Sequence, residues 1–372
     1  MLTPMIKPTK SLKMDLRKTM QYFLLAAGTI FFISCEKEDD TPRLEGYARG
    51  VFIVCEGTFN ASNGSISWYD PDSNIVMNNL FEHVNGRPAG DVLQSFTLAG
   101  DLGVIVANNS QKIEVVDLAT FESVSTITGF TYPRYFAYTG NGSGYLSNGN
   151  LDGHVYRVEL ENGIITDTIE VGMGPEQMVV AGNHLYVANS GGWAFDNTVS
   201  VIDTRSNEVV TTVEAGDIPV ALVTDRDGNV WVLSRGRVVY NETWTEIIEE
   251  TDSRLVRINP ATLKADRSVV IGVRGDGFNP SWLSVSADGE TLYYGEAGGV
   301  YAMAIDSQVQ PSEPMLPDNF SYAATCPSTG RFFTLEITDY TSPGKLHIFN
   351  DGDPEGSYNT GIAPRGLAFG HH

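Results

Sequence analysis

Residues 185–219 read LYVANSGGWAFDNTVSVIDTRSNEVVTTVEAGDIP, and this stretch decides the fold. Apolar residues alternate with polar ones from Val199 to Asp203, which predicts a half-buried strand that ends in an Asx-type turn. An aromatic-rich strand pattern ending at Asn189 precedes it, and a third strand pattern begins at Glu208. Short strand patterns joined by turns predict an antiparallel sheet.

The same unit recurs seven times along the chain. The polar-ended strand pattern closes at Asp70, Asp117, Glu159, Asp203, Asn259, Asp306 and Asn350. A second column, mostly proline, precedes the first strand of each unit: Pro88, Pro133, Pro175, Pro219, Pro280, Phe320 and Pro364. Its members lie 40 to 45 residues apart, except for one interval of 61 residues that indicates an insertion in the fourth unit. Repeats of this length with period-two alternation predict a β-propeller.

The two ends of the chain complete the last unit. Residues 364–372 supply one strand and residues 50–87 supply the other three. A single blade cannot bury its own faces, so the array has to close into a ring, and closure leaves no free sheet edge. We therefore predict an all-β domain over residues 50–372. It is a seven-bladed β-propeller of four-stranded blades, the last blade closed by both termini.

Two columns of the repeat have structural interpretations. The aromatic column, which we assign to the core between blades, consists of Phe52, Ile105, Tyr145, Tyr186, Trp231, Tyr293 and Phe333. The aspartates that end the strands (Asp70, Asp117, Asp203 and Asp306) could suggest carboxylate chemistry. We interpret them instead as side chains that cap β-turns at one end of the blades, here called the lower face.

The N-terminus predicts an exported protein. Basic residues precede an apolar run at residues 22–33, which is too short to span a bilayer and is typical of a signal peptide. The run ends at Phe32-Ile-Ser-Cys35, which resembles a bacterial lipobox with Phe32 in place of the usual leucine. We predict a signal peptide over residues 1–34, with Met14 as an alternative start, and a lipid anchor on Cys35.

The acidic run Glu36-Lys-Glu-Asp-Asp40 follows the predicted lipid site. It resembles the surface-export signal of Bacteroidetes lipoproteins, and a plain solvated tether is the alternative. We predict an acidic tether over residues 35–49, and an outer-membrane lipoprotein that is exposed at the cell surface.

Composition excludes several function classes. The formal net charge is −22, and so acidic a surface repels nucleic acids and anionic glycans. The six histidines are scattered, and the chain has no HExxH, CxxC, GxSxG or phosphate-loop motif. We expect no catalytic residue, no metal, no cofactor and no enzymatic activity.

Cys55 and Cys326 fall at opposite ends of their strands and are not expected to pair.

The face opposite the capped turns, here called the upper face, collects aromatic and polar residues in unequal loops. Clustered exposed aromatics favour a ligand or partner, and a small core within the loops is the alternative. The predicted ligand-binding residues are Phe59, Tyr132, Arg134, Asn189, Trp193, Phe195, Tyr240, Trp244, Phe278, Trp282, Tyr340 and Arg365. The polar strand ends, such as Asn108, Asn148 and Asn189, either line this site or cap loop amides.

The stretches LYVANS and TVSVIDTRSNEVVTTVEAGDIP resemble the YVTN or YncE-like propeller repeat. Bacteroidetes surface lipoproteins with this repeat include BtuG-like proteins, which capture cobalamin and cover a TonB-dependent transporter. The resemblance implies a small-molecule ligand, cobalamin by preference, and an outer-membrane TonB-dependent transporter as partner. A glycan-binding or adhesion propeller is the first alternative, and a propeller enzyme of the lyase or lactonase type is the second.

Overall fold

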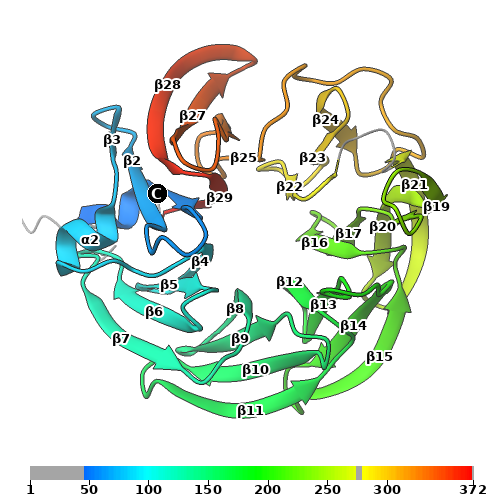
Figure 1. Cartoon of the computed structure of the whole chain (residues 1–372), viewed down its shortest axis with the longest axis horizontal. Helices are drawn as coiled ribbons and strands as arrows, with labels where there is room; N and C mark the ends of the chain where they lie inside the picture. The colour runs from blue at the N-terminus through cyan, green and yellow to red at the C-terminus, as the bar shows by residue number, and fades with distance from the viewer. Residues whose placement is uncertain (1–45, 274–278, 371–372) are drawn as a thin grey trace, which may run out of the picture. The chain divides into compact units, whose positions relative to one another are not determined.

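The computed structural model describes residues 46–273 and 279–370, all within one compact unit, Leu44–His372. Seven small antiparallel sheets stand around a central axis (Figure 1). The innermost strands β4, β8, β12, β16, β22, β25 and β29 contact one another in sequence around that axis, and β29 contacts β4. The predicted seven-bladed β-propeller is therefore confirmed.

The strands of each blade follow one another from the axis outwards. The first blade contains β4 (Leu93–Ala99), β5 (Leu102–Ala107), β6 (Lys112–Asp117) and β7 (Ser123–Thr128). The second contains β8 (Pro133–Gly140), β9 (Ser143–Asn148), β10 (His154–Glu159) and β11 (Ile164–Glu170). The third contains β12 (Pro175–Ala181), β13 (His184–Asn189), β14 (Thr198–Asp203) and β15 (Glu208–Glu214).

The remaining blades keep the same order. The fourth contains β16 (Pro219–Thr224), β17 (Val230–Ser234), β20 (Asp252–Asn259) and β21 (Lys264–Val273). The fifth contains β22 (Leu283–Val285), β23 (Thr291–Glu296) and β24 (Gly299–Ala304), and the sixth β25 (Tyr322–Thr325), β26 (Phe332–Glu336), β27 (Pro343–Asn350) and β28 (Asp353–Ile362). The seventh contains β29 (Pro364–Phe369), β1 (Val51–Cys55), β2 (Ser65–Asp70) and β3 (Ile75–Met77).

The ring closes as the sequence predicts, by pairing the two ends of the domain. Strand β29 lies antiparallel to β1, with Val51 opposite Phe369 and Ile53 opposite Leu367. Thus the innermost strand of the seventh blade comes from the C-terminus, and the other three strands come from the N-terminal part.

The fifth blade departs from the prediction of four strands, because its sheet has only three. The segment after β24 contains Pro311, Pro314 and Pro317, which have no backbone N–H to donate to a ladder. Only Leu316 forms a bridge, to Val300, where the outer strand is expected.

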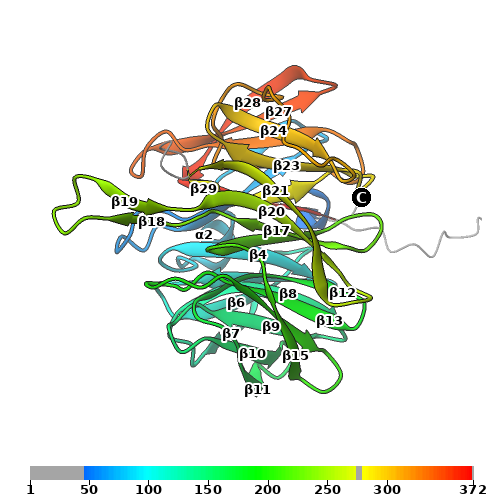
Figure 2. The same cartoon turned by 90° about the vertical axis from the view of Figure 1, so that its right-hand side faces the viewer.

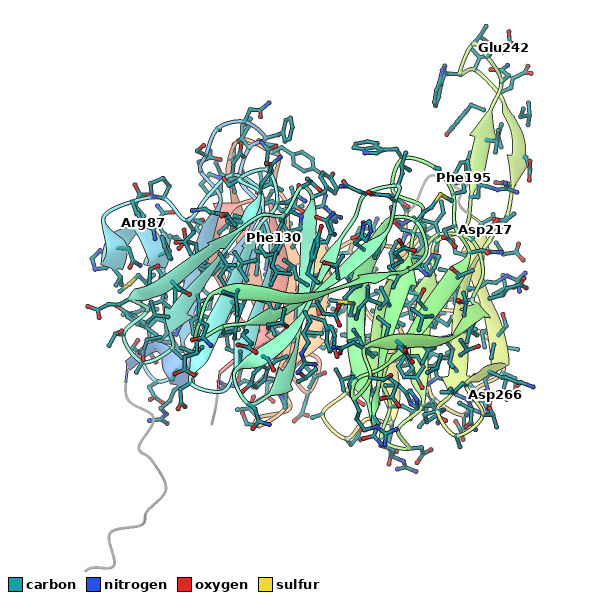
Figure 3. All side chains as sticks on the ribbon, turned by 90° about the horizontal axis from the view of Figure 1, so that it is seen from below. Arg87, Phe130, Phe195, Asp217, Glu242 and Asp266 are labelled. Atoms are coloured by element: carbon teal, nitrogen blue, oxygen red, sulfur yellow. The ribbon has the colours of Figure 1, made fainter. Side chains whose placement is uncertain are left out.

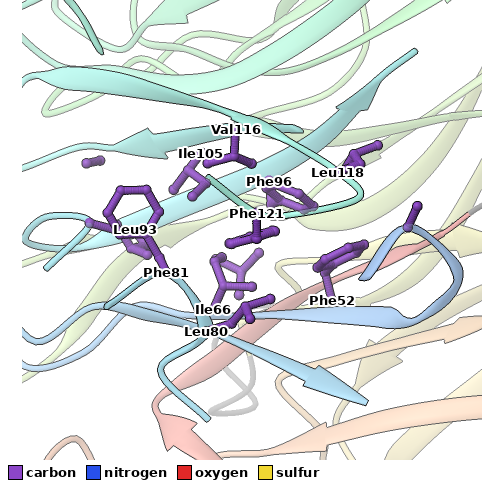
Figure 4. Close-up of a cluster of buried hydrophobic side chains, with 14 residues drawn as sticks. Phe52, Ile66, Leu80, Phe81, Leu93, Phe96, Ile105, Val116, Leu118 and Phe121 are labelled. Atoms are coloured by element: carbon purple, nitrogen blue, oxygen red, sulfur yellow. The ribbon is translucent and has the colours of Figure 1, made fainter. Parts of the chain in front are cut away.

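The core lies between the blades. Phe52, Phe96 and Phe121 pack together where the seventh blade meets the first, with Phe52 and Phe121 stacked at 5.6 Å between ring centroids (Figure 4). The predicted aromatic column is buried at Phe52, Ile105, Tyr145, Tyr186, Trp231 and Phe333. In the fifth blade the predicted residue, Tyr293, packs between the blades against Phe332 of the sixth but is only half-buried, while the neighbouring Tyr294 is fully buried on the side of the fourth blade.

The lower-face turns confirm the capping role for three of the four aspartates, Asp70, Asp117 and Asp203. Asp70 accepts a hydrogen bond from the backbone N–H of Asp72 at 3.0 Å, and Asp117 accepts one from Ala119 at 2.9 Å. Asp306 instead accepts a hydrogen bond from Gln308 through its backbone carbonyl. Cys55 and Cys326 are both buried and free, so the expectation that they do not pair is also confirmed.

Two elements before the first blade were not predicted. Residues Gly46–Arg49 form a 3-10 helix, η1, whose Tyr47 packs edge-on against Trp68 at 5.1 Å. These four residues fall within the predicted tether, and this aromatic contact holds them against the seventh blade. A short helix, α2 (Leu80–Asn85), lies between β3 and β4, so the first inner strand begins at Leu93 rather than directly after Pro88. The predicted signal peptide and Cys35 lie outside the described residues.

Candidate functional site

The upper face opens into a cavity of about 540 Å³ on the central axis. Its rim is built by residues at or beside the start of the inner strands, so every blade contributes to it. The rim residues, taken by blade from the first to the seventh, are Gln94, Arg134 with Tyr135, Glu176, Val220, Trp282, Tyr322 and Arg365. Glu56, which follows β1, also lines the cavity.

The first polar group of this rim joins the first three blades. Nε and Nη2 of Arg134 each lie 2.9 Å from Oε2 of Glu176, the neighbouring blade's rim residue. Nη1 of Arg134 donates to Gln94, whose amide nitrogen in turn donates to the hydroxyl of Tyr135 at 3.2 Å. Burial disfavours the charged guanidinium, but Glu176 outweighs that effect and holds the pKa of Arg134 above its ordinary value.

The second polar group joins the sixth and seventh blades. Nε of Arg365 lies 2.9 Å from Oε2 of Glu56, and its Nη2 donates to the hydroxyl of Tyr340 at 2.8 Å. Burial raises the pKa of Glu56 above its usual range, although Arg365 and Arg134 act in the opposite direction. Glu56 is therefore a carboxylate held in a dry environment by neighbouring guanidinium groups.

Aromatic rings complete the rim between the two polar groups. Trp282 is buried and donates its indole N–H to the backbone carbonyl of Phe320 at 3.1 Å, and its ring lies 5.8 Å from that of Tyr322. Burial is the main cause that raises the pKa of Tyr322 to about 12, so its hydroxyl stays neutral and available as a hydrogen-bond donor. The rim thus combines flat apolar surface with donors and acceptors in fixed positions.

The loop of residues 190–197 begins an aromatic path, a row of neighbouring side chains that leads from solvent to this rim. Residues 190–197 fold back over the connection before β12, where the N–H of Gly191 donates to the carbonyl of Met173 at 2.8 Å. Gly174 permits this approach, because a Cβ there would lie 1.9 Å from the backbone nitrogen of Gly192. The loop presents Trp193, which is 83% exposed, 6.4 Å from the ring of Tyr132. Tyr132 in turn lies 5.5 Å from the guanidinium of Arg134.

The structure brings together some of the predicted site residues and separates others. Arg134, Trp282 and Arg365 line the cavity, and Tyr132, Trp193 and Tyr340 lie beside it through the contacts above. Phe59 is 68% exposed in the loop after β1, which is joined to the Tyr340 loop where Thr58 Oγ1 donates to the carbonyl of Tyr340 at 2.7 Å. Phe278 lies outside the described residues.

Asn189 does not face the upper surface. It is fully buried, and its amide nitrogen donates to Ser200 at 2.9 Å within its own blade. Asn148 accepts the N–H of Tyr132 at 2.8 Å and so caps a loop amide, whereas Asn108 donates at 2.8 Å to the carbonyl of Pro133 at the start of β8. The capping interpretation therefore holds for Asn148, and Asn189 does not line the cavity.

Tyr240 and Trp244 also lie apart from the cavity. The insertion in the fourth blade forms a two-stranded hairpin, β18 (Val238–Tyr240) and β19 (Ile247–Glu250), that projects well beyond the blades (Figure 2). The predicted ligand-binding aromatics of residues 190–197 and of this hairpin, Trp193, Phe195, Tyr240 and Trp244, therefore do not all lie beside the cavity. Phe195 sits near the base of the hairpin, under the guanidinium of Arg237 at 5.4 Å.

Sequence reasoning missed Glu56, Gln94 and Glu176 at the rim. A signal for Glu176 exists, because it follows Pro175 as Arg134 follows Pro133 and Arg365 follows Pro364. Charged residues in that one position of the repeat indicate a ring at the start of the inner strands. Nothing in the sequence marks Glu56, since it reaches the rim only through closure of the ring.

Within residues 46–273 and 279–370, no three or more His, Cys, Asp or Glu side chains are grouped so that they could hold a metal ion. In the same residues no helix is long and apolar enough to cross a membrane.

The fold and this rim define a β-propeller with a polar and aromatic cavity at its upper mouth. Residues 49–325 match DUF5074, a domain of unknown function, and the chain belongs to this family. No curated protein sequence matches it.

Three solved structures share the fold. The chain is similar to a quinoprotein alcohol dehydrogenase-like protein from Bacteroides thetaiotaomicron, with a TM-score of 0.61 and 12% identity over 87% of this chain and 79% of the other. It is also similar to the dihydro-heme d1 dehydrogenase NirN, with a TM-score of 0.56 and 11% identity over 88% of this chain and 76% of the other. Kuenenia stuttgartiensis hydrazine synthase has a TM-score of 0.50 and 17% identity over 68% and 76% of the two chains. At these identities the likeness establishes the fold alone.

Proposed function

We propose that this protein is a cell-surface lipoprotein that captures a solute at the upper mouth of the propeller and passes it to an outer-membrane TonB-dependent transporter. Cobalamin is the preferred ligand. The observation that carries the proposal is the rim, where residues from all seven blades hold ion pairs, amides and aromatic rings around one cavity. Fixed polar groups among apolar surfaces are what recognition of a small molecule requires.

The chemistry of the rim suits a ligand rich in amides. Arg134 and Arg365 offer N–H donors, while Glu176 and Glu56 offer acceptors within 2.9 Å of those guanidinium groups. An amide has one acceptor and two donors, so it can bridge such a pair. The described lining includes three arginines and two glutamates in a chain of charge −22. The lining therefore contains more arginines than glutamates. It suits the negatively charged phosphate of a nucleotide tail better than the rest of the acidic surface would.

The size of the cavity also constrains how the ligand would lie. A corrinoid is larger than a cavity of about 540 Å³, so it would rest across the upper face with only its side chains in the mouth. Trp193, Tyr132 and Tyr340 stand beside the rim and supply flat surface for its apolar parts. The lipobox-like sequence that ends at Cys35 supports surface placement, and the resemblance to the YncE-like repeat supports cobalamin.

Titration of the purified propeller with cobalamin tests the ligand. We expect a change in the visible absorbance of the corrinoid, measurable heat, and a rise in melting temperature with ligand concentration. Arg365→Lys, which keeps the charge and loses the two-pronged geometry, should weaken binding about tenfold or more. Trp244→Ala on the distant hairpin is the matched control and should bind like the wild type.

A glycan-binding propeller is the second candidate, favoured by the exposed ring of Trp193, since aromatic platforms stack on sugars. If cobalamin gives neither heat nor thermal protection, the cobalamin assignment is wrong. A neutral glycan panel then tests the same rim variants.

A further inference from the structure

The β18–β19 hairpin carries a surface that the blades do not use. Every residue of β19 is exposed, and the hairpin presents Tyr240, Trp244, Ile247 and Ile248 at 43%, 78%, 41% and 64% exposure. No residue of 238–250 belongs to any described hydrophobic core cluster between the blades. Apolar side chains gathered on a projecting element are uncommon unless a partner covers them.

The base of the hairpin is fixed to the body of the propeller. Thr251 Oγ1 donates to Asp217 Oδ2 at 2.8 Å, and the N–H of Gly236 donates to the carbonyl of the same aspartate at 3.0 Å. Arg237 pairs with Glu249 and with Asp217, at 3.5 Å for the latter, while it covers the ring of Phe195. Figure 3 shows Phe195 and Asp217 near the body and Glu242 far out at the tip. The element is therefore held at one end and extended at the other.

The tip is also organised by its own side chains. Asn241 Oδ1 accepts the N–H of Thr245 at 3.0 Å, and its backbone carbonyl accepts the N–H of Trp244 at 2.9 Å. Trp244 has a φ of 59°, a left-handed conformation that is costly for a bulky residue. Its ring stacks on that of Tyr240, 5.7 Å between centroids. An isolated two-stranded hairpin is only marginally stable, so these contacts serve to keep the aromatic pair presented.

The charge of the hairpin selects the kind of partner. Residues 238–250 contain four glutamates and no lysine or arginine. Anionic lipid would be repelled, and a second copy of this chain would bring the same four glutamates and a formal charge of −22. A protein surface with an apolar groove for Trp244 and a rim of Lys or Arg complements both features.

We propose that the β18–β19 hairpin is a docking finger that inserts its Tyr240–Trp244 pair into an apolar groove with a basic rim on a partner protein. The proposal goes beyond capture of a solute, because it assigns the hairpin to protein recognition and leaves ligand contact to the rim. A fixed base lowers the ordering cost of binding, as preorganised surfaces do.

Site-specific photo-crosslinking in the producing cells, with the full-length chain, provides the test. A benzophenone side chain is placed at Ile248 and, as control, at Val309, which is 70% exposed after β24. We expect the Ile248 probe to yield one protein adduct, identified by mass spectrometry, that the Val309 probe does not give. The purified partner should then bind the wild-type chain directly.

Binding of the purified partner to hairpin variants tests which side chains recognise it. Trp244→Ala should weaken the purified interaction by tenfold or more, and Glu246→Lys should weaken it and reduce its sensitivity to salt. Melting temperatures of both variants should match the wild type. Adducts with lipid only, adducts with a second copy, no adduct, or a partner indifferent to Trp244→Ala would each overturn the proposal. A failure to bind cobalamin would not contradict the docking proposal, since the hairpin lies apart from the cavity.

Discussion

Nε of Arg365 lies 2.9 Å from Oε2 of Glu56, so an ion pair connects the last strand of the propeller to the loop that follows the first. The same two residues line the cavity. One contact therefore contributes both to closure of the ring, beside the β29–β1 ladder, and to construction of the rim, and the site exists only in a chain whose two ends have met.

Removal of residues 364–372 should unfold the domain. These residues supply β29, whose loss exposes the edge of β1 and takes away the inner wall of the seventh blade. An uncovered inner edge can pair with another chain, so we expect the truncated chain to lose cooperative melting or to aggregate. Circular dichroism on heating measures this, with a chain lacking only residues 371–372 as control. An unchanged melting temperature for the longer truncation would contradict this account of closure.

Acid should weaken the domain through Glu114. Burial opposes its charge, but hydrogen bonds from Arg87, Lys112 and Thr126 prevail and hold its pKa at about 2, below the ordinary 4.5. A lowered carboxylate pKa gives stability that is present above pH 4.5 and is lost as the pH falls towards 2. We expect the difference in unfolding free energy between wild type and Glu114→Gln to shrink by about 2 kcal/mol from pH 6 to pH 3.

Urea titrations at several pH values measure that difference. The exposed turn residue Glu161 offers the control, because Glu161→Gln removes a carboxylate without this network. A Glu114→Gln curve parallel to the wild-type curve across this range would show that the network does not hold the charge in solution.

The sequence could predict the blades because period-two alternation and the proline column repeat in every unit. Burial of Tyr145, Tyr186 and Trp231 follows from that pattern alone. The missing outer strand of the fifth blade was also readable, since three prolines fall in the segment where it should lie. The partial exposure of Tyr293 was not readable, because it depends on how closely the fifth and sixth blades pack.

The site was less accessible to sequence reasoning. Arg134 and Glu176 are 42 residues apart in the chain, and the 2.9 Å contact between them depends on the angle between neighbouring blades. Likewise, an insertion rich in aromatics has the same composition whether it folds over the mouth or projects beyond the blades. Figure 2 shows that the hairpin projects, and Arg237 and Thr251 hold its base against Asp217.

Cys35→Ala should release the protein from the membrane and leave the propeller folded. Thioether-linked acyl chains on Cys35 would be the anchor, and each buried methylene contributes about 0.8 kcal/mol to membrane binding. Cell fractionation and palmitate labelling measure the effect, and Cys55→Ser serves as control because Cys55 is buried in the core. Palmitate retained by the Cys35→Ala chain would rule out this anchor.

Trp193→Ala and Tyr186→Ala should have opposite effects on binding and on stability. Trp193 is 83% exposed and touches the rim only through Tyr132, whereas Tyr186 is fully buried between blades. We expect Trp193→Ala to weaken cobalamin binding by about 1–3 kcal/mol, the scale of an aromatic anchor, with little change in melting temperature. Tyr186→Ala should cost about 3–5 kcal/mol of unfolding free energy through the cavity it leaves.

Calorimetric titration and thermal melting of both variants separate the two roles. Tyr186→Ala, measured at a temperature where it remains folded, should bind the ligand with nearly wild-type affinity, because no contact links its ring to the rim. Trp244→Ala should change neither quantity, since its ring is 78% exposed and stacks on Tyr240 of the hairpin, away from the cavity and the inter-blade core. If Trp193→Ala lowers the melting temperature as much as Tyr186→Ala does, Trp193 belongs to a small core within its loop, and the aromatic path to Arg134 is structural rather than a ligand contact.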